Sequence, residues 1–159
     1  MAVSLSFDLI ENASVAYVHY LSFMLCFGAL IYERISLKVD LDRKEAIAMV
    51  LADIVYGVAG IALLVSGIYR VIKYGQGSDF YTENPVFWAK MITFGLIGSL
   101  SIYPTVTYIL WSLPLSKGKL PKISNNLVSR LRLIINIELL GFSSIPFLAT
   151  LMARGVGLS

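Results

Sequence analysis

The stretch VHYLSFMLCFGALIYER, residues 18–34, is almost entirely apolar and long enough to form a helix that crosses a membrane. It contains His19, the only histidine of the chain, and it ends on the charged pair Glu33 and Arg34. Three other stretches have the same apolar character. The chain is therefore expected to cross a membrane four times, at about residues 13–32, 46–69, 86–112 and 133–152, since about 20 apolar residues span the hydrocarbon layer.

Composition supports an integral membrane protein. The 159 residues are 57% hydrophobic, with a mean hydropathy of +0.77, and a soluble domain of this length could not bury so much apolar surface. Continuous apolar runs exclude the alternating pattern of a transmembrane β-barrel. We predict an all-α fold, a four-helix up-down bundle that forms one domain over residues 1–159, because short loops make sequential helices antiparallel neighbours.

Basic residues predict the orientation. Nine of them lie in the two loops expected on one side: Arg34, Lys38, Arg43, Lys44, Lys117, Lys119, Lys122, Arg130 and Arg132. Only Arg70, Lys73 and Arg154 lie on the other. The positive-inside rule then places both termini on the outer, periplasmic or lumenal side. The expected location is a bacterial inner membrane, or a thylakoid or organellar membrane. The net charge of +3 reflects this asymmetry and predicts no nucleic-acid site.

Residues 1–12 lack the basic region of a secretory signal, so the first apolar segment is expected to stay as an anchor. The single cysteine, Cys26, lies inside that segment and indicates no disulfide. It is expected to be a small packing residue.

Each expected span contains an ionisable side chain: His19, Asp53, Lys90 and Glu138. Such a group costs about 2.5–3.5 kcal/mol at the centre of a membrane helix, so these side chains are expected to face the bundle interior. Their depths predict a cationic cluster of His19, Lys90 and Arg70 near the outer face. Asp53 and Glu138 are expected to form an acidic cluster near the inner face, with Arg34 in reach.

Several roles remain open for the cationic group. His19 could hydrogen-bond Asp53 or a hydroxyl, ligate a metal or haem, or relay protons. Lys90 could extend its amine to the outer interface or bind a carboxylate. Arg70 could be an interfacial anchor.

The acidic group has open alternatives as well. Asp53 and Glu138 could share a proton, or pair with Arg34 as a structural contact. Glu33 is expected to be solvated.

Common enzyme templates are absent. One histidine and one cysteine cannot form a zinc site or a bis-histidine haem site, and no phosphate loop or nucleophile elbow occurs. The sequence still allows a haem held by His19, alone or with Met24, Met91, Lys90 or water as the sixth ligand. The two haem propionates would suit Lys90 and Arg70.

Four stretches resemble an uncharacterised family of small four-helix membrane proteins known from bacteria, including cyanobacteria. They are ERISLKVDL (33–41), DIVYGVAGI (53–61), SGIYRVIKYGQGSDFYTENPVFWAK (66–90) and LSIYPTVTYILW (100–111). The resemblance covers nearly the whole chain and is most specific from Tyr69 to Lys90. The family is labelled only as a domain of unknown function, so it implies little biochemistry.

A more distant likeness concerns the first span. His19, Gly28, Tyr32 and Arg34 are similar to the first helix of the bacterial membrane protoporphyrinogen IX oxidases, and FWAK, ending at Lys90, resembles their Trp-x-x-x-Lys with a different spacing. That family binds haem b, and its histidine and lysine are essential. The resemblance implies His19 as haem ligand and Lys90 as a residue that binds substrate or propionate. The second histidine of that family is missing here.

The leading prediction is a haem-b-binding membrane protein with a redox or tetrapyrrole-related role. His19 would be the metal ligand, and Arg70 and Lys90 would bind the cofactor. Lys90, Asp53 and Glu138 would be catalytic, with the two carboxyls forming a proton path. Expected partners are lipid and a tetrapyrrole substrate, and whether the protein is an enzyme is left open.

Two alternatives belong to other classes. The row of ionisable groups would suit a proton-coupled transporter or permeation unit for a small solute, which would need to oligomerise. A non-catalytic assembly or scaffold subunit would use the glycines of residues 46–69 to pack on a partner. The chain is therefore expected to form a homo-oligomer or to be a subunit of a membrane complex.

Overall fold

The computed structural model describes residues 2–75 and 78–157, and the described residues form helices without any strand. Four helices are long: α1 (Ala2–Ser36), α2 (Arg43–Tyr74), α4 (Pro85–Ser116) and α5 (Asn125–Ala153). A short helix, α3 (Ser78–Thr82), precedes α4. Each long helix is apolar enough to cross a membrane. The predicted all-α class with four spans is confirmed, and each long helix continues beyond the predicted span.

Capping residues explain where the long helices begin. Asp42 accepts a hydrogen bond from the backbone of Glu45, whose side chain accepts one from the backbone of Asp42 in return. The Asn84 side chain caps α4 directly before Pro85, and Ser124 caps α5. Each cap binds a backbone N–H that has no partner inside its own helix, so the helices begin at these polar residues and not where the apolar run begins.

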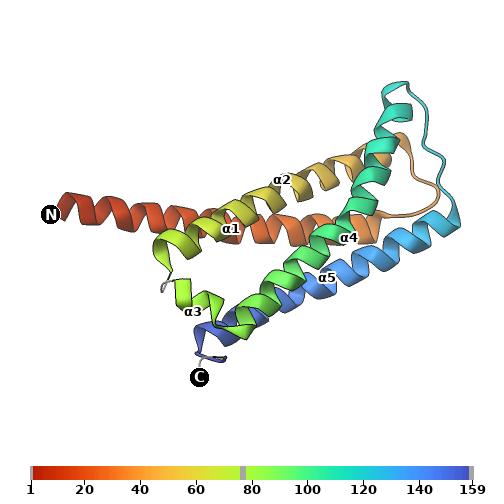
Figure 1. Ribbon diagram of the computed structural model, residues 1–159. Coiled ribbons are helices and arrows are strands. Elements are labelled where there is room, and N and C mark those ends of the chain that lie inside the picture. The colour runs from red at the N-terminus through yellow and green to blue at the C-terminus, as the bar shows by residue number, and fades with distance from the viewer. Residues whose placement is uncertain (1, 76–77, 158–159) are drawn as a thin grey trace.

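The long helices form two pairs, α1 with α2 and α4 with α5 (Figure 1). Contacts of α2 with α4 and of α1 with α5 join the pairs into one bundle. The N- and C-termini lie toward the same end of the bundle (Figure 1), here called the terminal end. The loops of residues 37–42 and 117–124 lie at the opposite, basic end. Which end faces the cytoplasm stays a prediction.

Large apolar side chains cover the outside of all four long helices. The most exposed include Phe7, Ile35, Ile61, Ile72, Leu140 and Phe147. A surface with so many exposed apolar side chains is unfavourable in water and is typical of helices that face lipid.

The buried core is concentrated toward the basic end. It includes Cys26, Leu30, Met49, Tyr108, Leu131, Ile135 and Phe142. Toward the terminal end, the last buried residues of the four long helices are Ser22, Ser66, Ile97 and Phe142. Beyond them, no helix residue with a described side chain is buried. We call the two parts the packed half and the open half.

Two polar contacts tie the terminal end together. The Asn84 amide, which is fully buried, donates to the Val156 carbonyl at 3.3 Å and links the start of α4 to the turn after α5. Lys73 forms an ion pair with Glu11 at 2.6 Å, which links α2 to α1. These two contacts join helices in the open half, but they do not form a core. In the part of the chain that the structure describes, the interior of the open half lacks the buried apolar side chains that fill the packed half.

One glycine marks a close approach of α4 and α5. A Cβ atom built on Gly141 would lie 2.6 Å from the Ile97 side chain, which is itself buried. Gly57 and Gly60 of α2 have no neighbour within 4 Å of such an atom, so they make no close helix contact within the chain.

Replacing Gly141 with alanine should lower the free energy of unfolding by about 1 kcal/mol or more, because overpacking a core costs about 1–3 kcal/mol and outweighs the gain in helix propensity. Gly98→Ala is the matched control, since nothing lies near Gly98. It should be neutral or slightly stabilising. Unfolding in mixed detergent micelles, followed by circular dichroism, measures both. Ile97→Val should restore part of the loss in Gly141→Ala, and equal effects of the two glycine variants would contradict this packing.

Candidate functional site

The structure brings His19, Arg70 and Lys90 together in the open half. These residues come from α1, α2 and α4, and the charges of Arg70 and Lys90 both act on the His19 ring. Arg70 also acts on Lys90. We call these residues the cationic cluster. It lies where the packing of the core ends, because His19 is one helical turn from Ser22, the last buried residue of α1.

Hydrogen bonds define the tautomer of His19. Its Nδ1 lies 3.1 Å from the Leu63 carbonyl oxygen and 3.0 Å from the Ser66 hydroxyl. The carbonyl can only accept, and the Ser66 hydroxyl already donates to the Ala62 carbonyl at 2.6 Å. Nδ1 therefore carries the hydrogen that these contacts require. Nε2 keeps its lone pair and hydrogen-bonds no described residue.

One role left open for His19, a hydrogen bond to a hydroxyl, is present, because the ring contacts Ser66. A hydrogen bond of His19 to Asp53 is not present, and Asp53 is bonded to Thr105 instead. The ring also packs closely on α2. A Cβ atom built on Gly67 would lie 3.1 Å from His19 Cε1, so a larger residue at Gly67 would press on the imidazole. The absence of a side chain there lets the ring lie against the helix that supplies its hydrogen-bond partners.

Arg70 and Lys90 rest on aromatic rings. The Arg70 guanidinium lies 5.1 Å from the centroid of Tyr20 and donates to its hydroxyl at 3.4 Å. Lys90 Nζ lies 5.3 Å from the centroid of Phe87. Neither cation forms an ion pair with a described carboxylate. Two positive charges beside an imidazole with a free lone pair are suited to a ligand that carries carboxylates.

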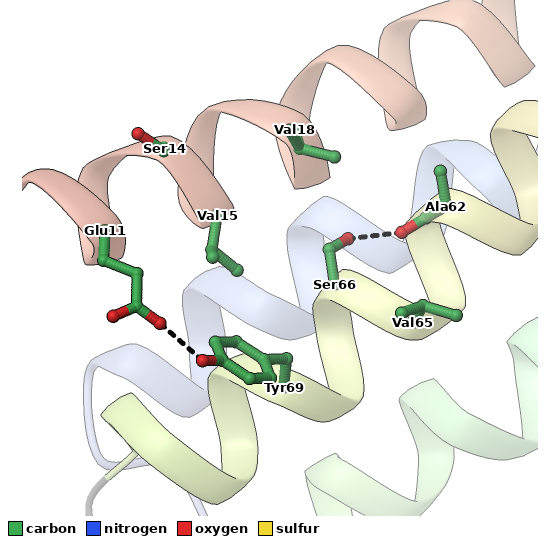
Figure 2. A pocket seen from close by; sticks show the side chains of 8 residues that line it. All are labelled: Glu11, Ser14, Val15, Val18, Ala62, Val65, Ser66 and Tyr69. Carbon is green, nitrogen blue, oxygen red and sulfur yellow. Dashed lines mark hydrogen bonds between the residues drawn. The ribbon is translucent and has the colours of Figure 1, made fainter.

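The nearby carboxylate Glu11 is already neutralised. Lys73 donates to both of its oxygens, at 2.6 and 2.7 Å, and the Tyr69 hydroxyl also donates to it. Figure 2 shows Glu11 and Tyr69 meeting at one end of a groove of about 460 Å³ between α1 and α2. The walls of this groove are mostly apolar. In a membrane, lipid chains would fill such a groove, and it offers little to a polar substrate.

The predicted carboxyls Asp53 and Glu138 lie in the packed half. Asp53 is 7% exposed and accepts a hydrogen bond from Thr105 Oγ1 of α4 at 2.8 Å. Glu138 is 0% exposed, and neither of its carboxyl oxygens has a hydrogen-bond partner among the described residues. The two lie close enough for their charges to interact. Asp53 and Glu138 are therefore near one another but differ in hydrogen bonding.

Arg34 forms no ion pair with these carboxyls, so the alternative in which it pairs with them is not observed. Its Nε donates instead to the Asn136 side chain of α5 at 2.6 Å. The ion pairs between described residues are Lys38 with Glu45 and Lys73 with Glu11. Successive side chains on a helix point about 100° apart, so Arg34 faces a different direction from Glu33, the residue before it.

The expectation that Glu33 is solvated is wrong, because its side chain is 1% exposed. Helix α1 continues to Ser36, so Glu33 lies within the helix and not at its end. It falls on the buried face of Cys26, Leu30 and Leu37, which are spaced by three or four residues. That spacing was the signal in the sequence that would have identified Glu33 as an interior residue.

Glu33 joins Asp53 and Glu138 to form what we call the acidic cluster. The charges of Asp53 and Glu138 act on Glu33, and all three carboxyls act on the Tyr108 hydroxyl. Each long helix contributes one group to this region. Helices α1, α2 and α5 supply the three carboxyls, and α4 supplies Tyr108. Within the described ranges, however, no three His, Cys, Asp or Glu side chains are close enough to hold one metal ion.

Thr105→Val should lower the free energy of unfolding by about 1 kcal/mol, because Asp53 loses its hydrogen-bond donor from α4. Thr107→Val is the control, since the Thr107 hydroxyl bonds only the Tyr103 carbonyl of its own helix at 2.8 Å. Unfolding in mixed micelles would compare the two. An equal, small effect of both substitutions would show that the Asp53–Thr105 bond contributes nothing to the joining of α2 and α4.

Comparison with known proteins identifies the family. A family model described as "Predicted membrane protein (DUF2214)" matches residues 11–157, which cover α1 from Glu11 through the turn after α5. No match to the chain was found among curated proteins or among solved structures. With its four helices able to span the bilayer, this is a multi-pass integral membrane protein. The chain belongs to the predicted membrane protein family DUF2214.

Proposed function

We propose that the protein binds haem b in the open half, where His19 would hold the haem iron, and has a redox or tetrapyrrole-related role. The observation that carries the proposal is the hydrogen bonding of His19. Nδ1 donates to the Leu63 carbonyl and Ser66, which leaves the Nε2 lone pair free. Histidines that bind metals usually donate their other ring N–H to a carbonyl or carboxylate in this way, which holds the ring in place.

The chemistry of the neighbouring residues also suits the cofactor. Haem b has two propionates, and Arg70 and Lys90 are two cations without an ion-pair partner among the described residues. Both lie close enough to act on the His19 ring. His19 is itself partly exposed, and beyond Ser22 and Ser66 toward the terminal end no helix residue of α1 or α2 with a described side chain is buried.

Haem supplies one-electron chemistry when bound, and the protein would tune it through His19 and the residues around it. Leu63 and Ser66 would orient His19, and Arg70 and Lys90 would neutralise carboxylates. The proposed catalytic roles of Asp53 and Glu138 are less direct. Asp53 lies ten residues from Leu63 in α2, about 15 Å along the helix. A proton would need intermediate groups or water to move between the clusters.

A second candidate function is proton-coupled permeation of a small solute. It is favoured by the buried carboxyl oxygens of Glu33 and Glu138 that lack hydrogen-bond partners in the described structure. Ionisable groups inside membrane helices commonly line ion or proton pathways. Proton flux into liposomes that contain the protein, followed with a trapped pH dye, distinguishes this function from haem binding.

The haem proposal predicts a Soret band at near-stoichiometric haem when the protein is purified in mild detergent, oxidised and then reduced with dithionite. His19→Ala should lose the band. Arg70→Gln or Lys90→Gln should weaken haem affinity by roughly 10-fold or more, since a hydrogen bond to a charged group contributes about 1.5–3 kcal/mol. Lys73→Gln is the matched control, because Lys73 lies at the same end of the bundle and pairs with Glu11. It should leave haem content unchanged.

Two results would contradict the proposal. The first is a colourless protein that stays colourless when haem is added to the folded, helical preparation. The second is a His19→Ala protein that keeps full haem content, which would remove His19 as the ligand even if haem binds elsewhere.

A further inference from the structure

The packed half contains buried polar atoms that the proposed haem site does not use. Glu33, Glu138 and Tyr108 are 1%, 0% and 0% exposed. One oxygen of Glu33, both of Glu138 and the Tyr108 hydroxyl are buried and have no hydrogen-bond partner among the described residues. Buried polar groups are nearly always satisfied in folded proteins, so these four atoms together require a ligand that supplies hydrogen bonds.

Charged and titratable groups reach this region from all four long helices. Asp53 and Tyr56 come from α2, Tyr108 from α4 and Glu138 from α5, while Glu33 shares α1 with Cys26. None of the groups that act on Glu33 is a cation. Two arginines toward the basic end of the bundle donate to other groups. Arg34 donates to Asn136, and Arg132 donates to the Leu37 carbonyl at 2.6 Å.

Three ionised carboxylates without a cation would repel one another in a medium of low polarity. A metal ion could compensate the charge, but the carboxyls are not close enough to ligate one together. Protons and water remain as ligands. A proton turns a carboxylate from an acceptor into a donor, and a water molecule placed among such groups can join two to four of them.

The members of the cluster are not equivalent. Asp53 receives a hydrogen bond from Thr105 Oγ1 at 2.8 Å, so one of its oxygens has a partner. Glu33 and Glu138 receive none from a described residue through their buried oxygens. The Tyr108 hydroxyl approaches Glu33 closely enough to interact with it, without a hydrogen bond of normal geometry. A small shift or a bridging water would connect them.

We propose that Glu33 and Glu138 form a proton-binding site inside the membrane, in which both carry protons at neutral pH and water links them to Tyr108. Asp53, hydrogen-bonded to Thr105, is the third carboxyl of the cluster. Glu33 is as much a member of this site as the two carboxyls that the sequence indicated. The inference concerns the packed half and does not depend on haem binding in the open half.

Infrared spectroscopy of the protein in lipid nanodiscs tests the proposal. Protonated carboxylic acids have a C=O stretch separate from the bands of carboxylates, and this stretch shifts to lower frequency in D₂O. The wild-type protein should show it at neutral pH. Glu33→Gln and Glu138→Gln should each remove part of the intensity, because each substitution removes one protonated acid. Tyr108→Phe should shift the band without removing it.

Glu11→Gln is the matched control, because Glu11 also belongs to α1 but is ion-paired with Lys73. It should leave the band unchanged. The same samples should keep the haem content of the wild type, so that a failure of this proposal is distinguishable from a failure of haem binding.

The wild-type spectrum decides the question even if a variant does not fold. A folded wild-type protein without a protonated carboxyl band at neutral pH would overturn the proposal. A band that both glutamine variants retain in full would also overturn it. A band that disappears when NaCl or KCl is added at constant pH would assign the site to a metal cation instead.

Discussion

The structure depends on the cost of exposing an ionisable side chain to hydrocarbon. Each of the four long helices carries such a group within its apolar length: His19, Asp53, Lys90 and Glu138. Because lipid cannot solvate these groups, each helix must turn its ionisable side chain toward the other helices. The large apolar side chains then face outward, where lipid replaces the protein core as their environment. The faces by which the helices pack follow from this requirement.

The bundle satisfies this requirement differently in its two halves. In the packed half, apolar side chains such as Leu30 and Phe142 surround the acidic cluster and keep it from solvent. In the open half, Arg70 and Lys90 are supported by the rings of Tyr20 and Phe87, and no core encloses them. Groups of opposite charge are therefore held at different depths, with no ion pair joining them among the described residues.

Much of the fold was predictable because a membrane imposes simple rules on length and hydropathy. The four helices and their single bundle follow from those rules, whereas their ends depend on caps such as Asp42 and Ser124 that lie outside the apolar runs. Glu33 was misjudged because the first span was expected to end before it. The hydrogen bond of His19 to Ser66 depends on the register of α1 against α2, which hydropathy does not determine.

The uneven core places different demands on side-chain volume along the bundle. In the packed half, a change of one methylene at a residue such as Ile135 leaves a cavity or a clash, since that side chain is fully enclosed. Toward the terminal end, the described helix side chains are at least partly exposed, so most can change in size at lower cost, except at close contacts such as that of Gly67 with His19. Sequence variation could therefore remodel the surroundings of His19 while the helices keep their arrangement. A single scaffold of this kind tolerates changes in side-chain volume at one end and preserves a fixed polar interior at the other.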